Sequence, residues 1–377
     1  MRVLYITSPS FFDLDVSLIR ELSKNIEVEV LFLVSPISMN GSAFSIKELP
    51  INVSICRFSE ISELSKYSKI LDTNRWNIAS VPVYNYINCI KLGRKVKEFL
   101  KGKEYDIVHS TGVGKQSMFI IPAISRYKRL LTMHDPITHG RESKIAFYRR
   151  LLFVSFYKNI LLLSHSLEAE FLAKFKIASP QLYFSRLGIY DYFCSIDALN
   201  PKIKDYILFF GRIEEYKGVD VLIEAFNKSK SKKQGIKLVI AGKGELPANF
   251  NPNDNQVIAY NRFIENEELS GLIKSSICTV LPYKSATQSG CVMTSFAFNK
   301  PVIATNVGDL PNEVCHKKTG YIVDANDSSA LSKAIDLVAI ENFSSLSENI
   351  KSMYYNNGEK SWVSIANNLI KVYNDIL

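Results

Sequence analysis

The sequence predicts an α/β protein with two Rossmann-like domains, each built around a parallel sheet. Short apolar strand patterns alternate with helical patterns along almost the whole chain, and such alternation is typical of parallel sheets covered by helices. The 377 residues also exceed what one hydrophobic core usually holds. Turn-forming residues gather near 188–204 between two series of alternating elements, so we expect the domains to join there.

The first series covers residues 1–198. Its strand patterns are short, and the stretch 159–164 is almost entirely apolar, as expected of a strand covered on both faces. We expect strands at 2–8, 27–34, 51–57, 106–110, 129–134, 159–164 and 181–187. Helices are expected where apolar residues recur at helical spacing, at 13–25, 85–102, 142–157 and 166–175.

The second series covers residues 199–358 and repeats the alternation. We expect its strands at 205–211, 237–242, 255–261, 277–283, 301–306 and 320–323. Its helices are expected at 218–229, 266–275, 289–298 and 327–341. The remaining residues, 359–377, place apolar side chains at helical spacing and precede no further strand, which predicts an amphipathic helix packed on an existing domain.

Composition and charge narrow the function classes. The chain is 47% hydrophobic and 22% charged, as in folded soluble proteins. It has no apolar run of transmembrane length and no signal-peptide pattern after Met1-Arg2, so we expect a cytoplasmic protein. The net charge of +9 favours a phosphate-bearing partner, whether a nucleotide, a nucleic acid or an anionic lipid surface. No nucleic-acid-binding motif occurs, so we expect no nucleic-acid partner.

Two cations follow the first strand of the second series. Arg212 and Lys217 lie on a short loop that Gly211 opens and Gly218 closes. Ligands of open α/β sheets bind at the carboxyl ends of the strands. An Arg fork and a Lys point charge can hold adjacent phosphates, which predicts a diphosphate site with Arg212 and Lys217 as catalytic residues. The alternative is that both are solvated loop cations in a lysine-rich protein.

A small-residue turn, Thr287-Gln288-Ser289-Gly290, opens an apolar helix after the strand 277–283. Amides at a helix N-terminus suit phosphate oxygens or sugar hydroxyls, although Ser289 would serve equally well as a simple N-cap. We therefore count Gln288, Ser289 and Gly290 among the donor-binding candidates. Candidates after neighbouring strands are Gly242 and Phe263.

A histidine ends the strand 129–134. His134 precedes Asp135, and His139 follows a few residues later. A histidine beside a carboxylate can orient or donate to a reacting sugar, and a satisfied structural histidine is equally consistent with the pattern. No Asp-x-Asp triplet occurs in the second series to hold a metal on a diphosphate, so we expect no metal ligands and no cofactor, with the nucleotide sugar as a substrate.

Two basic stretches are candidates for contact with an anionic membrane. One runs from Lys91 to Lys101 in the predicted helix 85–102, and the other runs from Arg141 to Lys158 and interleaves bases with aromatic residues. Such helices can lie on a negatively charged leaflet. An ordinary solvated helix with a buried aromatic face is the alternative.

Together these segments resemble the retaining glycosyltransferases of family 4, which have the GT-B fold, and the resemblance is strongest from about 205 to 324. The matching segments are Gly211-Arg212 with Lys217-Gly218, Ala241-Gly242-Lys243-Gly244, Lys300-Pro301-Val302-Ile303-Ala304-Thr305 with Gly308 and Pro311, Thr319-Gly320-Tyr321-Ile322-Val323, and His134-Asp135. The resemblance implies two Rossmann-like domains facing across a cleft. It also implies that the helix carrying Trp362 returns to the first domain.

The chain departs from the family pattern in two places. The usual Glu-x7-Glu pair is replaced by Ala286 and Thr294, of which Thr294 can still bond the donor ribose, and the turn 288–290 resembles a subgroup that reads "PY…QSG". After the first strand the family has a glycine pair, whereas this chain has Ser-Pro-Ser-Phe-Phe at 8–12. We place Ser10, Asp135 and His139 on the acceptor side.

The resemblance implies a retaining hexosyltransferase that moves a sugar from a UDP- or GDP-sugar to an acceptor hydroxyl. The expected acceptor is a glycan or lipid-linked glycan of cell-surface polysaccharide synthesis, reached at the inner face of a membrane. A non-catalytic nucleotide-sugar or glycan-binding protein on the same fold is the alternative, because Ala286 removes a carboxylate that the family uses.

Overall fold

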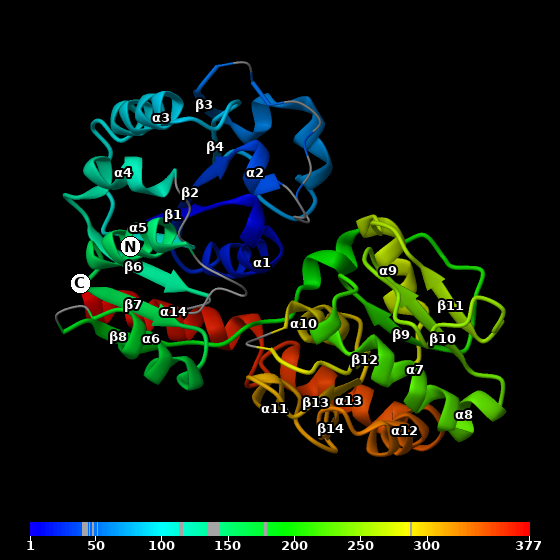
Figure 1. Ribbon diagram of the computed structural model, residues 1–377. Coiled ribbons are helices and arrows are strands. Elements are labelled where there is room, and N and C mark those ends of the chain that lie inside the picture. Colours follow the sequence, from blue (N-terminus) through cyan, green and yellow to red (C-terminus); the bar gives the residue numbers. More distant parts are fainter. Residues whose placement is uncertain are drawn as a thin grey trace. The chain divides into compact units, whose positions relative to one another are not determined.

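The computed structural model describes all residues except 40–43, 45, 47–48, 51, 113–115, 135–142, 177–178 and 287–288. The chain forms two compact units (Figure 1): unit 1 is residues 1–187 with 362–377, and unit 2 is residues 188–361. The division at Leu187 comes earlier than the expected boundary after 198 because the intervening segment packs on unit 2. Its backbone bonds there, from Tyr190 N to Met293 O at 3.3 Å and from Leu199 N to Glu267 O at 2.9 Å.

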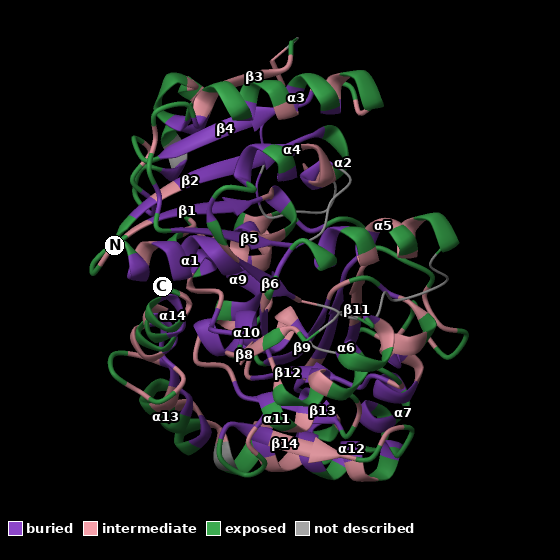
Figure 2. Cartoon of the chain, turned by 90° about the vertical axis from the view of Figure 1, so that its left-hand side faces the viewer, coloured by how far each residue is buried: buried purple, intermediate pink, exposed green. Residues whose placement is uncertain are grey.

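Unit 1 is built on an eight-stranded sheet of order β3-β4-β2-β1-β5-β6-β7-β8. All neighbours pair in parallel except β3 and β4, which are antiparallel. The strands are β1 (Arg2–Thr7), β2 (Glu27–Val34), β3 (Ser54–Arg57), β4 (Trp76–Ser80), β5 (Ile107–Thr111), β6 (Lys128–Met133), β7 (Asn159–Leu162) and β8 (Gln181–Phe184). The central strands are buried, as Figure 2 shows for β1, β2 and β4, so the polar groups available to ligands lie at their carboxyl ends.

Helices of unit 1 cover this sheet. They are α1 (Phe12–Leu22), α2 (Pro36–Met39), α3 (Tyr86–Phe99), α4 (Ser117–Ile124), α5 (Lys144–Ser155), α6 (Glu168–Lys174) and the terminal α14 (Trp362–Ile376). α14 packs beside α1 and buries Tyr373, whose hydroxyl lies 2.7 Å from Nδ1 of the buried His109 on β5. The terminal helix therefore belongs to the core of unit 1.

Unit 2 contains a six-stranded, fully parallel sheet of order β11-β10-β9-β12-β13-β14. Its strands are β9 (Tyr206–Phe210), β10 (Lys237–Ala241), β11 (Val257–Tyr260), β12 (Thr279–Leu281), β13 (Val302–Thr305) and β14 (Gly320–Val323). Its helices are α7 (Val219–Lys228), α8 (Lys230–Lys233), α9 (Asn266–Ser275), α10 (Gly290–Ala297), α11 (Leu310–Glu313), α12 (Ser328–Asp336) and α13 (Phe343–Tyr354).

The predicted α/β class with two parallel sheets is confirmed, and most predicted elements are present. Besides the one-turn helices α2 and α8, the expectations missed β4, α4 and α13. β4 mixes polar and apolar residues although every one of its side chains is buried, and α4 carries Pro122 inside it. The predicted helix 327–341 ends as α12 at Asp336 and continues through a π-helical stretch, Leu337–Asn342, into α13. No helix among the described residues is long and apolar enough to cross a bilayer.

Candidate functional site

Three loops meet at the carboxyl edge of the unit 2 sheet. The loop after β9 bonds to the loop after β10, from Gly211 N to Ala241 O at 3.0 Å and from Ile213 N to Lys243 O at 2.9 Å. A Cβ on Gly242 would lie 1.8 Å from the Gly211 carbonyl oxygen, so no larger residue fits there. Gly242 therefore brings two strand ends into backbone contact, and its part in donor binding stays a prediction.

Lys217 is a half-buried cation at this edge. It ends the short 3-10 helix η6 (Glu215–Lys217), and its Nζ lies 3.7 Å from the ring centroid of the buried Tyr283 and 5.1 Å from that of Tyr216. No carboxylate among the described residues pairs with it, and burial lowers the pKa of its ammonium group below the usual value. Lys217 thus offers an uncompensated positive charge on an aromatic surface.

The sharp turn after Lys217 fixes this position. Gly218 adopts φ +67°, and a Cβ there would lie 1.9 Å from the carbonyl oxygen of Pro282, which follows β12. Left-handed backbone and close approach both favour glycine. The loop that carries Lys217 is therefore held against the exit of the neighbouring strand.

Arg212 differs from Lys217 in its surroundings. Its side chain is 75% exposed, and it pairs with Glu214 at 2.8 Å. An exposed pair of this kind contributes little to stability, so Arg212 can exchange Glu214 for a stronger anion at small cost. The two cations predicted from the sequence do lie on one loop, and Lys217 is half-buried whereas Arg212 is exposed.

The helix α10 begins beside this loop. Ser289 is its N-cap residue but makes no side-chain cap; its hydroxyl lies 3.3 Å from that of Tyr283, the residue that also contacts Lys217. Among the described residues no acceptor meets the amides of Gly290 and Cys291. Gln288 lies outside the described residues. The start of α10 therefore presents free donors close to Lys217, as predicted.

Other donor-side candidates are placed less favourably. Thr294 is buried inside α10, and its hydroxyl donates to Gly290 O at 2.8 Å. Gly290 has a packing role as well, because a Cβ there would lie 2.9 Å from the ring of Tyr190. Phe263 follows β11 and is 56% exposed. The Thr294 hydroxyl is therefore already satisfied inside α10.

Glu313 was missed by the sequence reasoning. This buried residue ends α11, and its Oε1 accepts from Ser289 N at 3.3 Å. Its Oε2 is buried with no partner among the described residues, and burial raises the pKa of the carboxyl group well above the usual value. Glu313 therefore holds the start of α10 in place through its hydrogen bond with the Ser289 amide. Its one sequence signal is an acidic residue two places after Pro311.

In unit 1, His134 follows β6 and stacks on Phe11, with ring centroids 4.2 Å apart and planes inclined by 20°. Burial lowers the pKa of His134 to about 4, so the imidazole is neutral at pH 7. Its Nε2 is buried without a partner among the described residues. Asp135 and His139 lie outside the described residues, so the predicted pairing of His134 with Asp135 stays a prediction.

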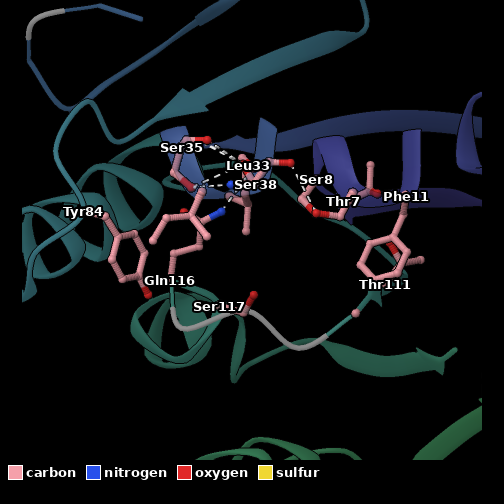
Figure 3. Close-up of a pocket in the computed structure, with 13 residues that line it drawn as sticks. Thr7, Ser8, Phe11, Leu33, Ser35, Ser38, Tyr84, Thr111, Gln116 and Ser117 are labelled. Carbon is pink, nitrogen blue, oxygen red and sulfur yellow. Dashed lines mark hydrogen bonds between the residues drawn. The ribbon is translucent and has the colours of Figure 1, made fainter. Parts of the chain in front are cut away.

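A cavity of about 280 Å³ opens at the carboxyl ends of β1, β2 and β5 (Figure 3). Hydroxyl-bearing side chains dominate its lining, which includes Thr7, Ser8, Ser10, Ser35, Ser38, Tyr84, Thr111, Ser117 and, with an amide, Gln116. We call it the hydroxyl cavity. The predicted acceptor-side residue Ser10 lies in it and donates to Ser38 O at 3.3 Å.

A buried carboxylate stands behind the hydroxyl cavity. Asp15 of α1 accepts from Tyr5 Oη at 2.9 Å, from Thr111 Oγ1 at 2.7 Å and from Thr7 Oγ1. Burial raises the pKa of Asp15 to about 6, while these three hydrogen bonds oppose the rise. The carboxylate therefore orients the two threonine hydroxyls of the cavity.

The two basic stretches are only partly as predicted. Exposed apolar side chains accompany the bases: Tyr86, Ile87 and Ile90 on α3, and Ile145, Tyr148, Leu152 and Phe156 at the face of α5 and its end. The prediction is wrong for Arg150, which cannot contact a membrane because it is buried, with its guanidinium 5.4 Å from the ring centroid of Phe175. Arg141 lies outside the described residues.

Comparison with known proteins gives one family match. Residues 196–359 match the family model described as Glycosyl transferases group 1. D-inositol 3-phosphate glycosyltransferase of Pseudarthrobacter chlorophenolicus is 26% identical over 140 residues, which is 35% of this chain and 33% of that protein. An uncharacterized 41.2 kDa protein in the cps region of Klebsiella pneumoniae is 22% identical over 172 residues, 46% of this chain and 47% of that protein. The chain thus spans between a third and a half of the length of these curated relatives.

Solved structures share the whole fold. HepE of Anabaena in complex with UDP and glucose has a TM-score of 0.66 at 12% identity, covering 100% of both chains. The catalytic domain of Starch Synthase IV from Arabidopsis thaliana, bound to ADP and acarbose, has a TM-score of 0.67 at 13% identity, covering 100% of this chain and 99% of that one. UDP-GlcNAc 2-epimerase from Methanocaldococcus jannaschii has a TM-score of 0.61 at 10% identity, covering 100% of both chains. The fold is therefore the two-domain GT-B architecture, which also serves an epimerase.

Proposed function

We propose that this protein is a glycosyltransferase that moves a sugar from a nucleotide-diphosphate sugar, UDP- or GDP-linked, to an acceptor hydroxyl. The observation that carries the proposal is the environment of Lys217, a half-buried cation without a carboxylate partner among the described residues, at the carboxyl edge of the unit 2 sheet. A buried positive charge is costly unless an anion pairs with it. The family match of residues 196–359 supports the same assignment.

The chemistry follows from where negative charge develops. As the bond between sugar and diphosphate breaks, charge gathers on the leaving oxygen, and preorganised cations and amides stabilise that change. Lys217 supplies a fixed charge, and Arg212 exchanges Glu214 for the phosphates. The free amides at the start of α10, held by Glu313 under Ser289, receive phosphate or sugar oxygens. His134, neutral at pH 7, would position a sugar through Nε2.

The finer assignments rest on narrower support. Retention of configuration and transfer of a hexose follow from the resemblance to family 4. Chemistry without a metal is supported by the absence of an Asp-x-Asp triplet from residues 199–377, with Arg212 and Lys217 in the place of a cation. The relative in the cps region of Klebsiella pneumoniae and the exposed apolar residues among the bases of α3 and α5 support an acceptor in cell-surface polysaccharide or lipid-linked glycan synthesis at a membrane.

A second candidate is a non-catalytic nucleotide-sugar or glycan-binding protein. It is favoured by Ala286, which stands where the family has a carboxylate on the donor sugar. The two functions share the diphosphate site and differ in turnover. Slow hydrolysis of a nucleotide sugar by the purified protein, in excess of the spontaneous rate, rejects the non-catalytic candidate.

A thermal-shift screen with UDP-glucose, GDP-mannose and ADP-glucose tests the proposed donor site. A ligand at 100 times its Kd stabilises the native state by about 2.7 kcal/mol, so we expect one of these donors to raise the Tm by a few degrees. Lys217→Gln removes that shift, whereas Lys237→Gln, at the opposite edge of the same sheet, retains it. A wild-type protein that no nucleotide sugar stabilises contradicts the proposal.

A further inference from the structure

We propose that unit 1 binds its acceptor as a phosphate-bearing glycolipid, with the sugar in the hydroxyl cavity, the phosphate at Arg149 and the hydrocarbon chain in an adjoining apolar cavity. This inference rests on the proposed function. The apolar cavity has a volume of about 470 Å³ and is lined by Tyr84, Asn85, Tyr86, Cys89, Met118, Phe119 and Arg149. Tyr84 lines both cavities, so they adjoin one another.

The floor of the hydroxyl cavity accepts hydrogen bonds. Thr7 and Thr111 both direct their hydroxyl hydrogens to Asp15, which leaves only oxygen lone pairs for a ligand. Sugar hydroxyls can donate to such oxygens, whereas a phosphate dianion has no hydrogen to give. The floor therefore selects a ligand group that donates.

Gln116 adds an acceptor to the same cavity (Figure 3). Its Nε2 donates to Leu33 O at 3.1 Å, and this bond fixes the amide orientation because a carbonyl oxygen can only accept. Gln116 is only 5% exposed, and its Oε1 is buried without a partner among the described residues. A buried amide oxygen without a partner is costly, and a sugar hydroxyl seated in the cavity would satisfy it.

No Lys, Arg or His side chain lines the hydroxyl cavity among the described residues, so a free sugar phosphate finds no counter-charge there. The charge lies instead beyond Tyr84. Arg149 has no carboxylate partner among the described residues, and its Nε is buried without a hydrogen-bond acceptor. Its positive charge acts on the Tyr84 phenol, opposing the rise to about 12 that burial causes in the pKa of Tyr84. A phosphate beside Tyr84 would accept charge-assisted hydrogen bonds from the Arg149 guanidinium.

Apolar side chains line the same cavity as Arg149. They are Met118, Phe119 and Tyr86, and Tyr86 is 78% exposed. On α5, Ile145, Tyr148 and Leu152 share a helical face with Arg149 and are also exposed, so apolar surface extends outward from the cavity. The two adjoining cavities thus combine acceptor groups in one with a cation and an apolar wall in the other, which suits a sugar joined through phosphate to a hydrocarbon chain.

The test uses full-length protein and two single-chain amphiphiles below their micelle-forming concentrations, dodecyl phosphate and dodecyl β-maltoside, with binding measured by titration calorimetry. We expect Arg149→Gln to weaken dodecyl phosphate about tenfold, as for the loss of one charge-assisted hydrogen bond, and to leave the maltoside nearly unchanged. Gln116→Met should weaken only the maltoside, and Phe119→Asp should weaken both. Lys69→Gln removes an equal charge from an exposed position of unit 1 outside both basic stretches and serves as the control.

The outcomes separate this inference from the proposed function. Donor-induced thermal shifts report the unit 2 site and should persist in every unit 1 variant, and an unchanged far-UV circular dichroism spectrum shows that unit 1 of each variant is folded. If the donor shift persists but Arg149→Gln and Lys69→Gln weaken dodecyl phosphate equally, charge alone attracts the amphiphile and the inference is wrong. Lys115 precedes Gln116 outside the described residues. Loss of maltose 1-phosphate binding on Lys115→Gln would likewise overturn the assignment of an uncharged sugar to the hydroxyl cavity.

Discussion

Lys217 and Arg212 carry the same formal charge and play different parts because their surroundings differ. Lys217 contacts the faces of two tyrosine rings, and desolvation lowers its pKa. A diphosphate in contact would favour the charged form again and restore the pKa. Arg212, largely exposed and paired with Glu214, is free to move to a ligand. The pair thus combines one fixed and one mobile positive charge.

Asp13 on α1 predicts a measurable pH dependence of stability. Burial raises the pKa of Asp13 to about 7, with Asp15 adding to the rise. Because the folded-state pKa lies above the unfolded value near 3.9, the native state binds more protons between about pH 4 and pH 7, and stability falls as pH rises through that window. Asp13→Asn removes this dependence. We expect the Tm of the variant, relative to wild type, to increase from pH 4 to pH 8 in calorimetric scans.

Asp197→Asn, at an exposed position of unit 2, is the matched control and should show the same Tm difference at every pH. His109 and His134 act in the opposite direction, because burial lowers their pKa values to about 3 and about 4. They are present in both proteins and cancel in the comparison. A Tm difference for Asp13→Asn that stays flat across the range would show that Asp13 is not desolvated.

At the scale of elements, periodicity predicted those strands and helices whose burial follows their sequence pattern. β4 was not predicted, because its position between β2 and β3 buries residues as polar as Asn77 and Ser80. α4 was not predicted, because its almost wholly apolar segment contains Pro122 and has no amphipathic periodicity. These elements are set by tertiary contacts, which local pattern does not contain.

The candidate site divides in the same way. Arg212, Lys217 and the turn before α10 could be predicted because they follow strands, and strand ends of a parallel sheet share one edge. Tyr283 and Glu313 could not, because their importance comes from contacts with Lys217 and Ser289 that only the folded chain creates. Gly242 has a close backbone contact that a sequence motif does not reveal.

The exposed face of α5 predicts binding to anionic membranes. Replacing Tyr148 and Leu152, which are 64% and 51% exposed, by serine removes apolar area that would insert between lipid headgroups. We expect the double variant to sediment with vesicles of phosphatidylcholine and phosphatidylglycerol about tenfold more weakly than wild type. Wild-type binding should also fall as salt is raised.

A double variant at Leu172 of α6 and Ile340 of unit 2, also exposed apolar positions but on elements other than α3 and α5, provides the control for general surface hydrophobicity. It should sediment like wild type. Equal loss in both double variants, or no binding of wild type to anionic vesicles, contradicts a membrane contact through α5.

The whole molecule assigns different chemistry to its two units. Unit 2 gathers cations and free amides at its sheet edge, which suits a diphosphate, whereas unit 1 gathers hydroxyl and amide oxygens, which suit a sugar. Substitutions in one unit should therefore leave ligand binding by the other intact. The proposed transfer reaction requires both.

The most direct test of the central claim is the rate at which the protein releases sugar from the nucleotide sugar that stabilises it, measured as kcat/KM. The account predicts that Lys217→Gln and Arg212→Gln each lower this rate about 100-fold or more, as for the loss of a group that stabilises developing charge, while Lys237→Gln stays within about twofold of wild type. Near-normal turnover by Lys217→Gln, in protein that still folds, would contradict the assignment of the diphosphate site.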